Sequence, residues 1–164
     1  MAKEHSFDVV SDVDFQEVEN ALGQARKEIG TRYDFKGVHV EIVRDKEKIT
    51  ITADDEFRLR AAIEVLTSKF IKRAVPVKNI EYSKQEAALG GSVRQIMNVR
   101  SGISSEISKD IVKTLKDQKR WKIQASIQGD QVRVTAKSKD TLQKAIGLLK
   151  EEDFGLELQF SNFR

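Results

Sequence analysis

The pattern of apolar and polar residues repeats once along this chain. Residues 48–66 begin with alternating apolar positions and continue with apolar residues at helical spacing, and residues 131–149 do the same. The two stretches align without a gap at an offset of 83 residues. Alternation indicates a half-buried strand, and apolar residues at i, i+3, i+4 and i+7 indicate an amphipathic helix. Each copy therefore predicts a strand that leads directly into a helix, and the repeat predicts two similar units.

The segments around each copy complete the same order of elements in both units. In the first unit the pattern predicts strand, helix, strand, strand, helix and strand, at 6–11, 12–30, 38–43, 47–53, 55–73 and 78–82. In the second unit it predicts a strand at 93–100, a helix from Ser104 or Ser105, strands at 121–127 and 131–135, a helix from Ser138 and a strand at 156–160. Residues 84–91 are interpreted as a linker, with Gly90 and Gly91 as a hinge.

This order predicts an α+β fold. Two βαββαβ units each form a four-stranded antiparallel sheet with both helices on one face, which is the ferredoxin-like plan of many RNA-recognition (RNP-like) domains. The other face of each sheet stays open, and alternation predicts which side chains it displays. In the second unit the expected outward residues are Lys122, Gln124, Ser126, Arg133 and Thr135. In the first unit they are His39, Glu41, Lys48, Thr50 and Thr52.

Composition and charge sharpen this picture. The first 90 residues carry 15 lysines and arginines against 17 aspartates and glutamates, whereas residues 91–164 carry 14 against 9. The second unit is therefore the basic one, and a basic half has either polyanion affinity or no charge-dependent partner. No apolar run approaches the length of a membrane span, and the N-terminus lacks the apolar region of a secretion signal. We therefore expect no membrane partner and a cytoplasmic location.

The residues that carry most enzyme chemistry are missing or isolated. The chain has no cysteine, which excludes disulfides, thiol catalysis and thiolate metal sites. Its two histidines, His5 and His39, do not have metal-ligand spacing. Gly90 and Gly91 are not followed by the Gly-Lys-Ser/Thr pattern of a phosphate loop. These features predict no catalytic residue, no metal and no cofactor, and hence a protein that is not an enzyme.

Four segments resemble one known family in the right order. They are SFDVVSDVD at 6–14, TRYDFKG at 31–37, IQGDQVRVTAKSKDTLQ at 127–143 and LQFSNFR at 158–164. On these segments the chain resembles the YajQ family of bacterial nucleotide-binding proteins along essentially its whole length. One departure is Ala136, where that family often has glycine, and alanine is compatible with a strand.

The resemblance implies two ferredoxin-like domains that exchange their first strands. One domain would then span residues 12–100, with the strand at 93–100, and the other would combine residues 1–11 with 101–164. The resemblance also implies binding of nucleotides or nucleic acid, and binding of cyclic dinucleotides has been proposed within the family. The expected partners are a nucleotide, a cyclic dinucleotide or RNA. The alternatives are a nucleotide-sensing regulator that acts on a protein partner and, ranked last, a phosphotransfer or hydrolytic enzyme.

The predicted ligand site combines basic, amide and hydroxyl groups on the open sheet faces and in a cleft between the domains. Its residues are Arg94, Arg100, Lys122, Gln124, Arg133 and Thr135. Arginine can hold phosphate with two parallel hydrogen bonds, and the amide and hydroxyl groups can bond to base edges. Arg94 and Arg100 have an alternative role as rim ion pairs with Glu41. Aromatic stacking is not expected on these faces, because the central strands 48–52 and 131–135 carry no outward aromatic residue.

Two other groups of residues offer competing sites. Lys109, Lys113 and Lys116 lie on one face of the first helix of the second unit. They form either a solvated helix face or a phosphate-binding stripe. The aromatic residues Tyr33, Phe35 and Trp121 precede the hairpins of the two units. They are expected to fill the core or the domain interface rather than to stack on bases.

Overall fold

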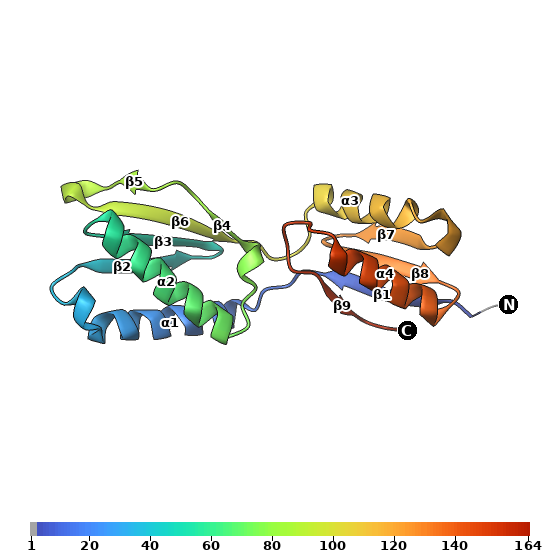
Figure 1. Ribbon diagram of the computed structural model, residues 1–164, viewed down its shortest axis with the longest axis horizontal. Coiled ribbons are helices and arrows are strands. Elements are labelled where there is room, and N and C mark those ends of the chain that lie inside the picture. The colour runs from blue at the N-terminus through green and yellow to red at the C-terminus, as the bar shows by residue number, and fades with distance from the viewer. Residues whose placement is uncertain (1–2) are drawn as a thin grey trace. The chain divides into compact units, whose positions relative to one another are not determined.

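The computed structural model describes residues 3–164, and the chain divides into two compact units (Figure 1). The central unit consists of Val13–Arg100. The terminal unit combines the N-terminal segment up to Asp12 with Ser101–Arg164. Each unit contains helices and an antiparallel sheet, so the predicted α+β class with antiparallel sheets is confirmed.

The terminal unit is built from segments at both ends of the chain. Its strands are hydrogen-bonded in the order β7-β8-β1-β9, and every neighbouring pair is antiparallel. The first strand of the chain thus lies in the middle of a sheet whose other strands follow residue 123. The elements are β1 (His5–Val10), α3 (Ser105–Lys116), η4 (Lys119–Trp121), β7 (Gln124–Gln128), β8 (Gln131–Ala136), α4 (Lys139–Glu151) and β9 (Gln159–Ser161).

The central unit has a sheet with the order β2-β3-β6-β4, and the short strand β5 pairs with β6. Its helices are α1 (Phe15–Thr31) and α2 (Glu56–Lys72), with short 3-10 turns η1 (Tyr33–Phe35), η2 (Val77–Asn79) and η3 (Leu89–Gly91). Its strands are β2 (Val40–Asp45), β3 (Lys48–Ala53), β4 (Ile80–Tyr82), β5 (Glu86–Ala87) and β6 (Val93–Val99).

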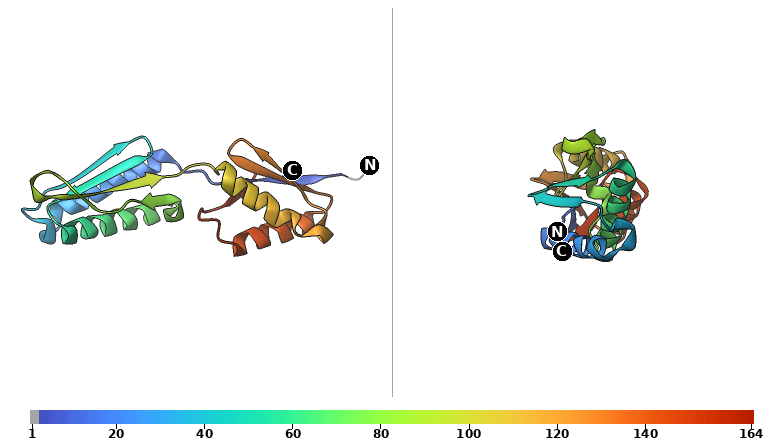
Figure 2. Two further views of the ribbon diagram at one scale, coloured as in Figure 1. Left: turned by 90° about the horizontal axis from the view of Figure 1, so that it is seen from above. Right: turned by 90° about the vertical axis from the view of Figure 1, so that its left-hand side faces the viewer.

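Local sequence explains where the helices start. Each begins after a residue whose side chain accepts a hydrogen bond from a backbone N–H of the first turn: Asp14, Asp55, Ser104 and Ser138. Such caps satisfy N–H groups that have no partner inside the helix. In each unit both helices lie on one side of the sheet, so the opposite sheet face carries no helix (Figure 2).

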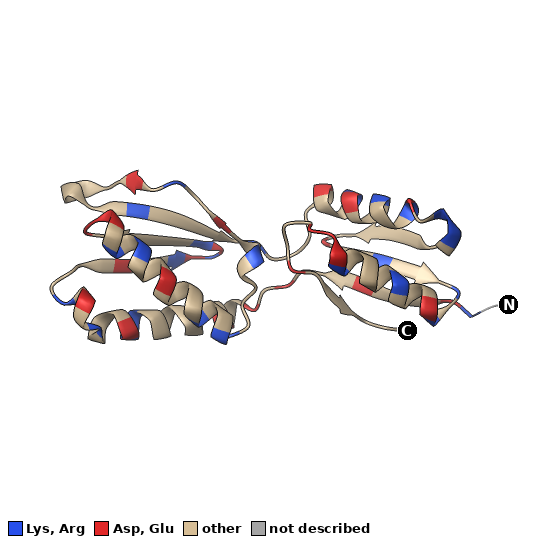
Figure 3. Cartoon of the chain, viewed as in Figure 1, with Lys and Arg blue, Asp and Glu red and all other residues tan. Residues whose placement is uncertain are grey.

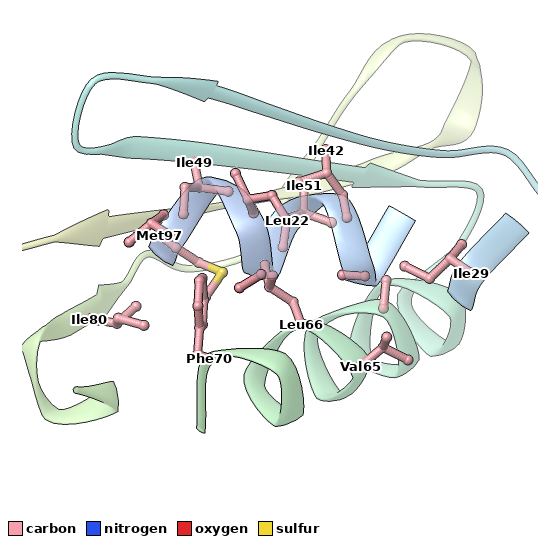
Figure 4. Packing of buried hydrophobic residues seen from close by; sticks show 14 of the residues in the cluster. Leu22, Ile29, Ile42, Ile49, Ile51, Val65, Leu66, Phe70, Ile80 and Met97 are labelled. Carbon is pink, nitrogen blue, oxygen red and sulfur yellow. The ribbon is translucent and has the colours of Figure 1, made fainter. Parts of the chain in front are cut away.

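Two separate hydrophobic cores hold the units. In the central core, Leu22 of α1 and Phe70 of α2 pack with Ile49, Ile51 and Met97 from β3 and β6 (Figure 4). All five side chains are fully buried. The terminal core is built in the same way from the inward positions of its strands and from α3 and α4: Phe7, Val9, Val132, Val134, Ile111, Leu115, Leu142 and Leu149.

The segment 84–91 is not a linker between the units. Its residues Glu86 and Ala87 form β5, which pairs with Arg94 and Val93 of β6. Gly90 and Gly91 have φ values of 72° and 80° and form the turn between these two strands. The prediction was wrong because small residues mark any tight turn, whether it joins domains or two strands of one sheet.

Candidate functional site

The open face of the terminal sheet carries amide and hydroxyl side chains and a few charged groups. Three of its residues are aligned across the strands in one row, with Gln124 of β7 opposite Thr135 of β8 and Thr135 opposite Ser6 of β1. The neighbouring row holds Ser126, Arg133, Asp8 and Ser161. Along β8 the outward side chains of Gln131, Arg133 and Thr135 are half-buried while the alternate residues are buried. The predicted residues Gln124, Arg133 and Thr135 therefore lie together on one face.

Arg133 does not present an unneutralised charge to a ligand. Its Nε and Nη2 donate to the two carboxylate oxygens of Asp8 at 2.9 and 3.4 Å. Asp8 is only 4% exposed and also accepts a hydrogen bond from Asn162 Nδ2 at 2.8 Å. The hydrogen bond from Arg133 is the main reason that the pKa of Asp8 lies below its ordinary value, although burial opposes this shift. The guanidinium is therefore held in the middle of the face by a buried carboxylate.

Lys122 is not on a strand, which corrects the prediction for the segment 121–127. Residues 119–121 form the 3-10 turn η4, and β7 starts only at Gln124. Lys122 follows this turn with φ 51° and ψ 45°, a left-handed conformation that breaks the alternation on which the prediction depended. Its side chain is exposed beside the start of β7, two residues before Gln124.

The open face of the central sheet has a different charge pattern. By strand register it carries the carboxylates Glu41, Asp45, Glu81 and Glu86 with the cations Lys48 and Arg94. Arg94 Nε donates to Glu86 Oε1 at 2.9 Å, so its ion-pair partner is Glu86 on β5 and not Glu41. An acidic surface repels phosphate, and this face is therefore a poor place for an anionic ligand.

Arg100 lies beyond the end of β6, where its backbone N–H donates to the carbonyl of the buried Asn79. Its Nη2 also donates to the Lys78 carbonyl at 3.4 Å. Arg94 and Arg100 thus belong to the central unit, whereas Lys122, Gln124, Arg133 and Thr135 belong to the terminal unit. The structure brings Gln124, Arg133 and Thr135 together on one face, with Lys122 outside the sheet before β7, and the cleft joining all six stays a prediction.

The cations at the end of α3 are the clearest positive cluster of the terminal unit. Figure 3 shows basic residues gathered at the last turn of this helix and in η4. They are Lys113, Lys116, Lys119 and Arg120, and none of them forms an ion pair with any residue between 3 and 164. Cations are favoured at a helix C-terminus because they interact with its partial negative charge, so this cluster has a structural role without any ligand.

A cavity of about 420 Å³ lies in the central unit between the end of α1, the loop around η1 and the edge strand β2. Polar and apolar groups share its walls about equally, and its ionisable side chains are Arg26, Lys36 and His39. The full lining is Arg26, Ile29, Gly30, Phe35, Lys36, Gly37, Val38, His39, Val40 and Ile42. No carboxylate is among these residues. The cavity therefore combines an apolar part of its wall with the cations Arg26 and Lys36 at its rim.

Comparison with known proteins identifies the family of this chain. The sequence model described as "Nucleotide-binding protein YajQ-like" matches residues 5–164. The chain belongs to the YajQ family. Its relatives include a "Nucleotide-binding protein" of Trichlorobacter lovleyi, 54% identical over 97% of this chain and 98% of the relative, and one of Carboxydothermus hydrogenoformans, 53% identical over the whole of both chains. A further relative, from Koribacter versatilis, is 48% identical over 98% of both chains.

The YajQ-family segment 31–37 lies at the cavity, although its aromatic residues differ in burial. Phe35 is 4% exposed and belongs to the central core, as predicted, whereas Tyr33 is 88% exposed and does not fill a core. Trp121 is half-buried. Sequence reasoning missed Arg26, Lys36 and His39 as a group, because Arg26 is separated from the loop by the end of a helix. The only signal in the sequence was the concentration of glycine, aromatic and basic residues at 30–39.

Two features of residues 3–164 bear on other functions. No helix in this range is both long enough and apolar enough to cross a membrane. In the same range, no three His, Cys, Asp or Glu residues come together in a way that could hold a metal ion.

Proposed function

We propose that this protein binds nucleotides or nucleic acid without catalysing their conversion, and that the open face of the terminal sheet contacts the ligand. The observation that supports this proposal most is the row Gln124–Thr135–Ser6 next to Ser126 and Arg133 on a face without a helix. Amides and hydroxyls both donate and accept hydrogen bonds, which suits the mixed pattern of base edges. The names of the relatives agree with this assignment.

The charged groups on and beside this face favour weak rather than tight binding of a phosphate-bearing ligand. Lys122 is exposed beside Gln124 and can contact phosphate, whereas Arg133 is held by Asp8 and acts mainly as a fixed donor in the middle of the face. Without aromatic residues at the outward positions of β7 and β8, base stacking contributes little. We therefore expect weak binding with little sequence preference.

The domain interpretation supports the same proposal. We interpret both units as ferredoxin-like domains whose first strands are exchanged, since the order β9-β1-β8-β7 and the order β4-β6-β3-β2 both place the first strand of the fold in the middle of the sheet. An RNP-like sheet of this kind offers its helix-free face to single-stranded nucleic acid. We place this activity in the bacterial cytoplasm.

The test is fluorescence anisotropy with a labelled, mixed-sequence single-stranded RNA of about eight nucleotides, a length in the range that one small binding fold covers. Gln124→Ala combined with Thr135→Val should weaken binding about tenfold, the equivalent of roughly 1.4 kcal/mol. The matched control is Thr52→Val, which removes the equivalent hydroxyl from β3 of the central sheet. Equal binding by the double variant and the wild type would contradict the proposed surface.

Two further outcomes separate the alternatives. A thermal-shift screen with mononucleotides, cyclic dinucleotides and RNA should give stabilisation by nucleotides or RNA, and stabilisation by one cyclic dinucleotide alone would favour a regulator that senses it. ATP and GTP incubated with repurified protein should not be hydrolysed above the buffer rate. Hydrolysis that disappears when one acidic residue is changed would show an enzyme.

A further inference from the structure

The cavity in the central unit has the chemistry of a binding site for a small phosphorylated molecule. Arg26 projects from α1 and donates from Nε and Nη2 to the Ile42 carbonyl on β2, at 3.2 and 2.7 Å. Its guanidinium is thus fixed against the edge of the sheet. Among residues 3–164, Arg26 has no carboxylate within 4.0 Å and no other hydrogen-bond acceptor. A fixed arginine whose charge is not neutralised differs from Arg133, which a buried aspartate holds.

The loop opposite Arg26 is held rigidly. Phe35 is buried in the central core, and the N–H groups of Lys36 and Val38 donate to the carbonyls of Tyr33 and Phe35 at 3.1 and 3.0 Å. Gly37 has φ 75°, a conformation that favours glycine. These constraints fix the backbone that carries Lys36, whose exposed ammonium group has no ion pair within the described range 3–164.

His39 completes the rim of the cavity. Its backbone N–H donates to Asp54 Oδ2 at 2.9 Å, which ties the loop to the turn after β3. Its imidazole Nε2 is 3.9 Å from Glu41 Oε2, and both side chains are more than half exposed. The carboxylates of Asp54 and Glu41 both lie beside the rim, but neither lines the cavity. Because β2 alternates, Val40 and Ile42 line the cavity while Glu41, with the His39 imidazole near it, faces the open side of the sheet.

Apolar side chains form one part of the cavity wall beside Arg26 and Lys36. Ile29, Phe35 and Ile42 are buried and line the cavity together with Val38 and Val40. A volume of about 420 Å³ falls at the small end of the range for ligand pockets, which suits a single small molecule and not a polymer. A ligand that matches both parts has one anionic group for the rim and a ring for the apolar wall.

We propose that this cavity binds a nucleoside monophosphate, with Arg26 and Lys36 at the phosphate and the base against the apolar wall. The choice of a nucleotide rests on the proposed function, whereas the anionic group and the ring follow from the cavity itself. The site is distinct from the sheet face proposed for nucleic acid, since one belongs to the central unit and the other to the terminal unit. The same protein would therefore hold a small nucleotide and a polynucleotide in different units.

The experiment is a titration of the full-length, ¹⁵N-labelled protein with AMP, GMP, CMP and UMP, followed by amide chemical shifts. Adenosine and inorganic phosphate serve as probes that carry only one half of the ligand. The expected result is saturable shifts between residues 26 and 42 with at least one monophosphate, and weaker shifts there with either half. Lys36→Met should raise the Kd for that monophosphate about tenfold, roughly 1.4 kcal/mol for a lost charge-assisted hydrogen bond.

A blocking variant with a matched control makes the test specific. Gly30 lines the cavity within α1, and a Cβ added there meets no atom within 4 Å, so Gly30→Leu fills space without removing a cation. Gly23→Leu is the control, because Gly23 is also in α1 with no atom within 4 Å of an added Cβ and does not line this cavity. Gly30→Leu should abolish the shifts, and Gly23→Leu and Lys27→Met should leave the Kd within about twofold of the wild type.

The outcomes separate this site from the sheet face. Monophosphate shifts confined to residues 122–135, or none between 26 and 42 with any monophosphate, would overturn the cavity while RNA binding to the sheet face could still stand. Unchanged binding by both Gly30→Leu and Lys36→Met would also overturn it. Shifts between 26 and 42 that Gly30→Leu removes would support the cavity even if RNA fails to bind the terminal sheet.

Discussion

The open faces of the two sheets differ in chemistry although their strands follow the same order. The terminal face carries amides and hydroxyls around one partly buried ion pair, Arg133–Asp8, whereas the central face carries four carboxylates and an exposed pair, Arg94–Glu86. The inward faces of both sheets remain apolar and match in the repeat. Packing constrains the inward positions closely, while solvated positions are free to diverge. The matching inward positions therefore identify the repeated fold, whereas the outward positions give each sheet face its own chemistry.

The largest expected effect tests which unit the first strand stabilises. Phe7 of β1 is fully buried, and its ring centroid is 5.8 Å from those of Phe160 and Phe163. Phe7→Ala should cost about 3–5 kcal/mol, the usual range for a phenylalanine lost from a core. Because Trp121 is the only tryptophan and belongs to the terminal unit, its fluorescence in urea should report this loss.

The matched variant is Met97→Ala in β6, which is equally buried but belongs to the central core. Amide exchange should show lost protection in residues 101–164 for Phe7→Ala and in residues 13–100 for Met97→Ala. Lost protection confined to residues 12–90 in the Phe7 variant would contradict the role of β1 in the terminal sheet.

The next effect compares the two arginines. Arg133→Ala leaves Asp8 buried without its main partner and should destabilise the terminal unit by more than the loss of an exposed pair does. Arg94→Ala removes a pair whose side chains are 45% and 47% exposed, and should cost less than about 1 kcal/mol. Urea midpoints of the two variants measure this difference. Similar losses of stability would mean that the Arg133–Asp8 pair contributes no more than the exposed Arg94–Glu86 pair.

Acidification should remove the stability that the Arg133–Asp8 pair gives to the terminal unit. The pKa of Asp8 is lowered in the folded protein, so its contribution to stability is full above the unfolded pKa of about 4 and is lost as the pH falls through the lower folded pKa. Urea midpoints followed by Trp121 fluorescence should therefore fall below pH 4. In Asp8→Asn, which is less stable at neutral pH, this part of the fall should be missing. An equally steep fall in the variant would assign it to other carboxylates.

The smallest effect concerns exposed lysines that lie near each face. Lys122→Ala should weaken RNA binding about twofold to threefold at low salt and less at physiological salt, because exposed charges are screened. Lys48→Ala on the central face is the control and should change binding by less than this. Anisotropy titrations at two salt concentrations measure both. A larger effect of Lys48 would place the nucleic acid on the central face.

Much of the fold follows from local patterns in the sequence. The helices at Phe15–Thr31 and Glu56–Lys72 and the strand at Lys48–Ala53 lie within three residues of their expected ranges, because caps and apolar periodicity act over a few neighbouring residues. The errors occur where a short 3-10 turn precedes a strand, as at residues 119–121, and where β5 pairs outside any apolar pattern. The middle position of β1 in the terminal sheet was expected from the family resemblance and not from periodicity.

The candidate sites depend much more on long-range geometry. Sequence placed Gln124, Arg133 and Thr135 on one face, since alternation along a strand is a local property. Only the tertiary structure decided that Arg133 is held by Asp8, 125 residues away, because an ion pair depends on the register between strands from opposite ends of the chain. The cavity beside Arg26 was likewise decided by tertiary structure, since a helix, a loop and an edge strand each contribute one wall. Periodicity records whether a residue is buried, whereas partners and cavities arise only when separate elements meet.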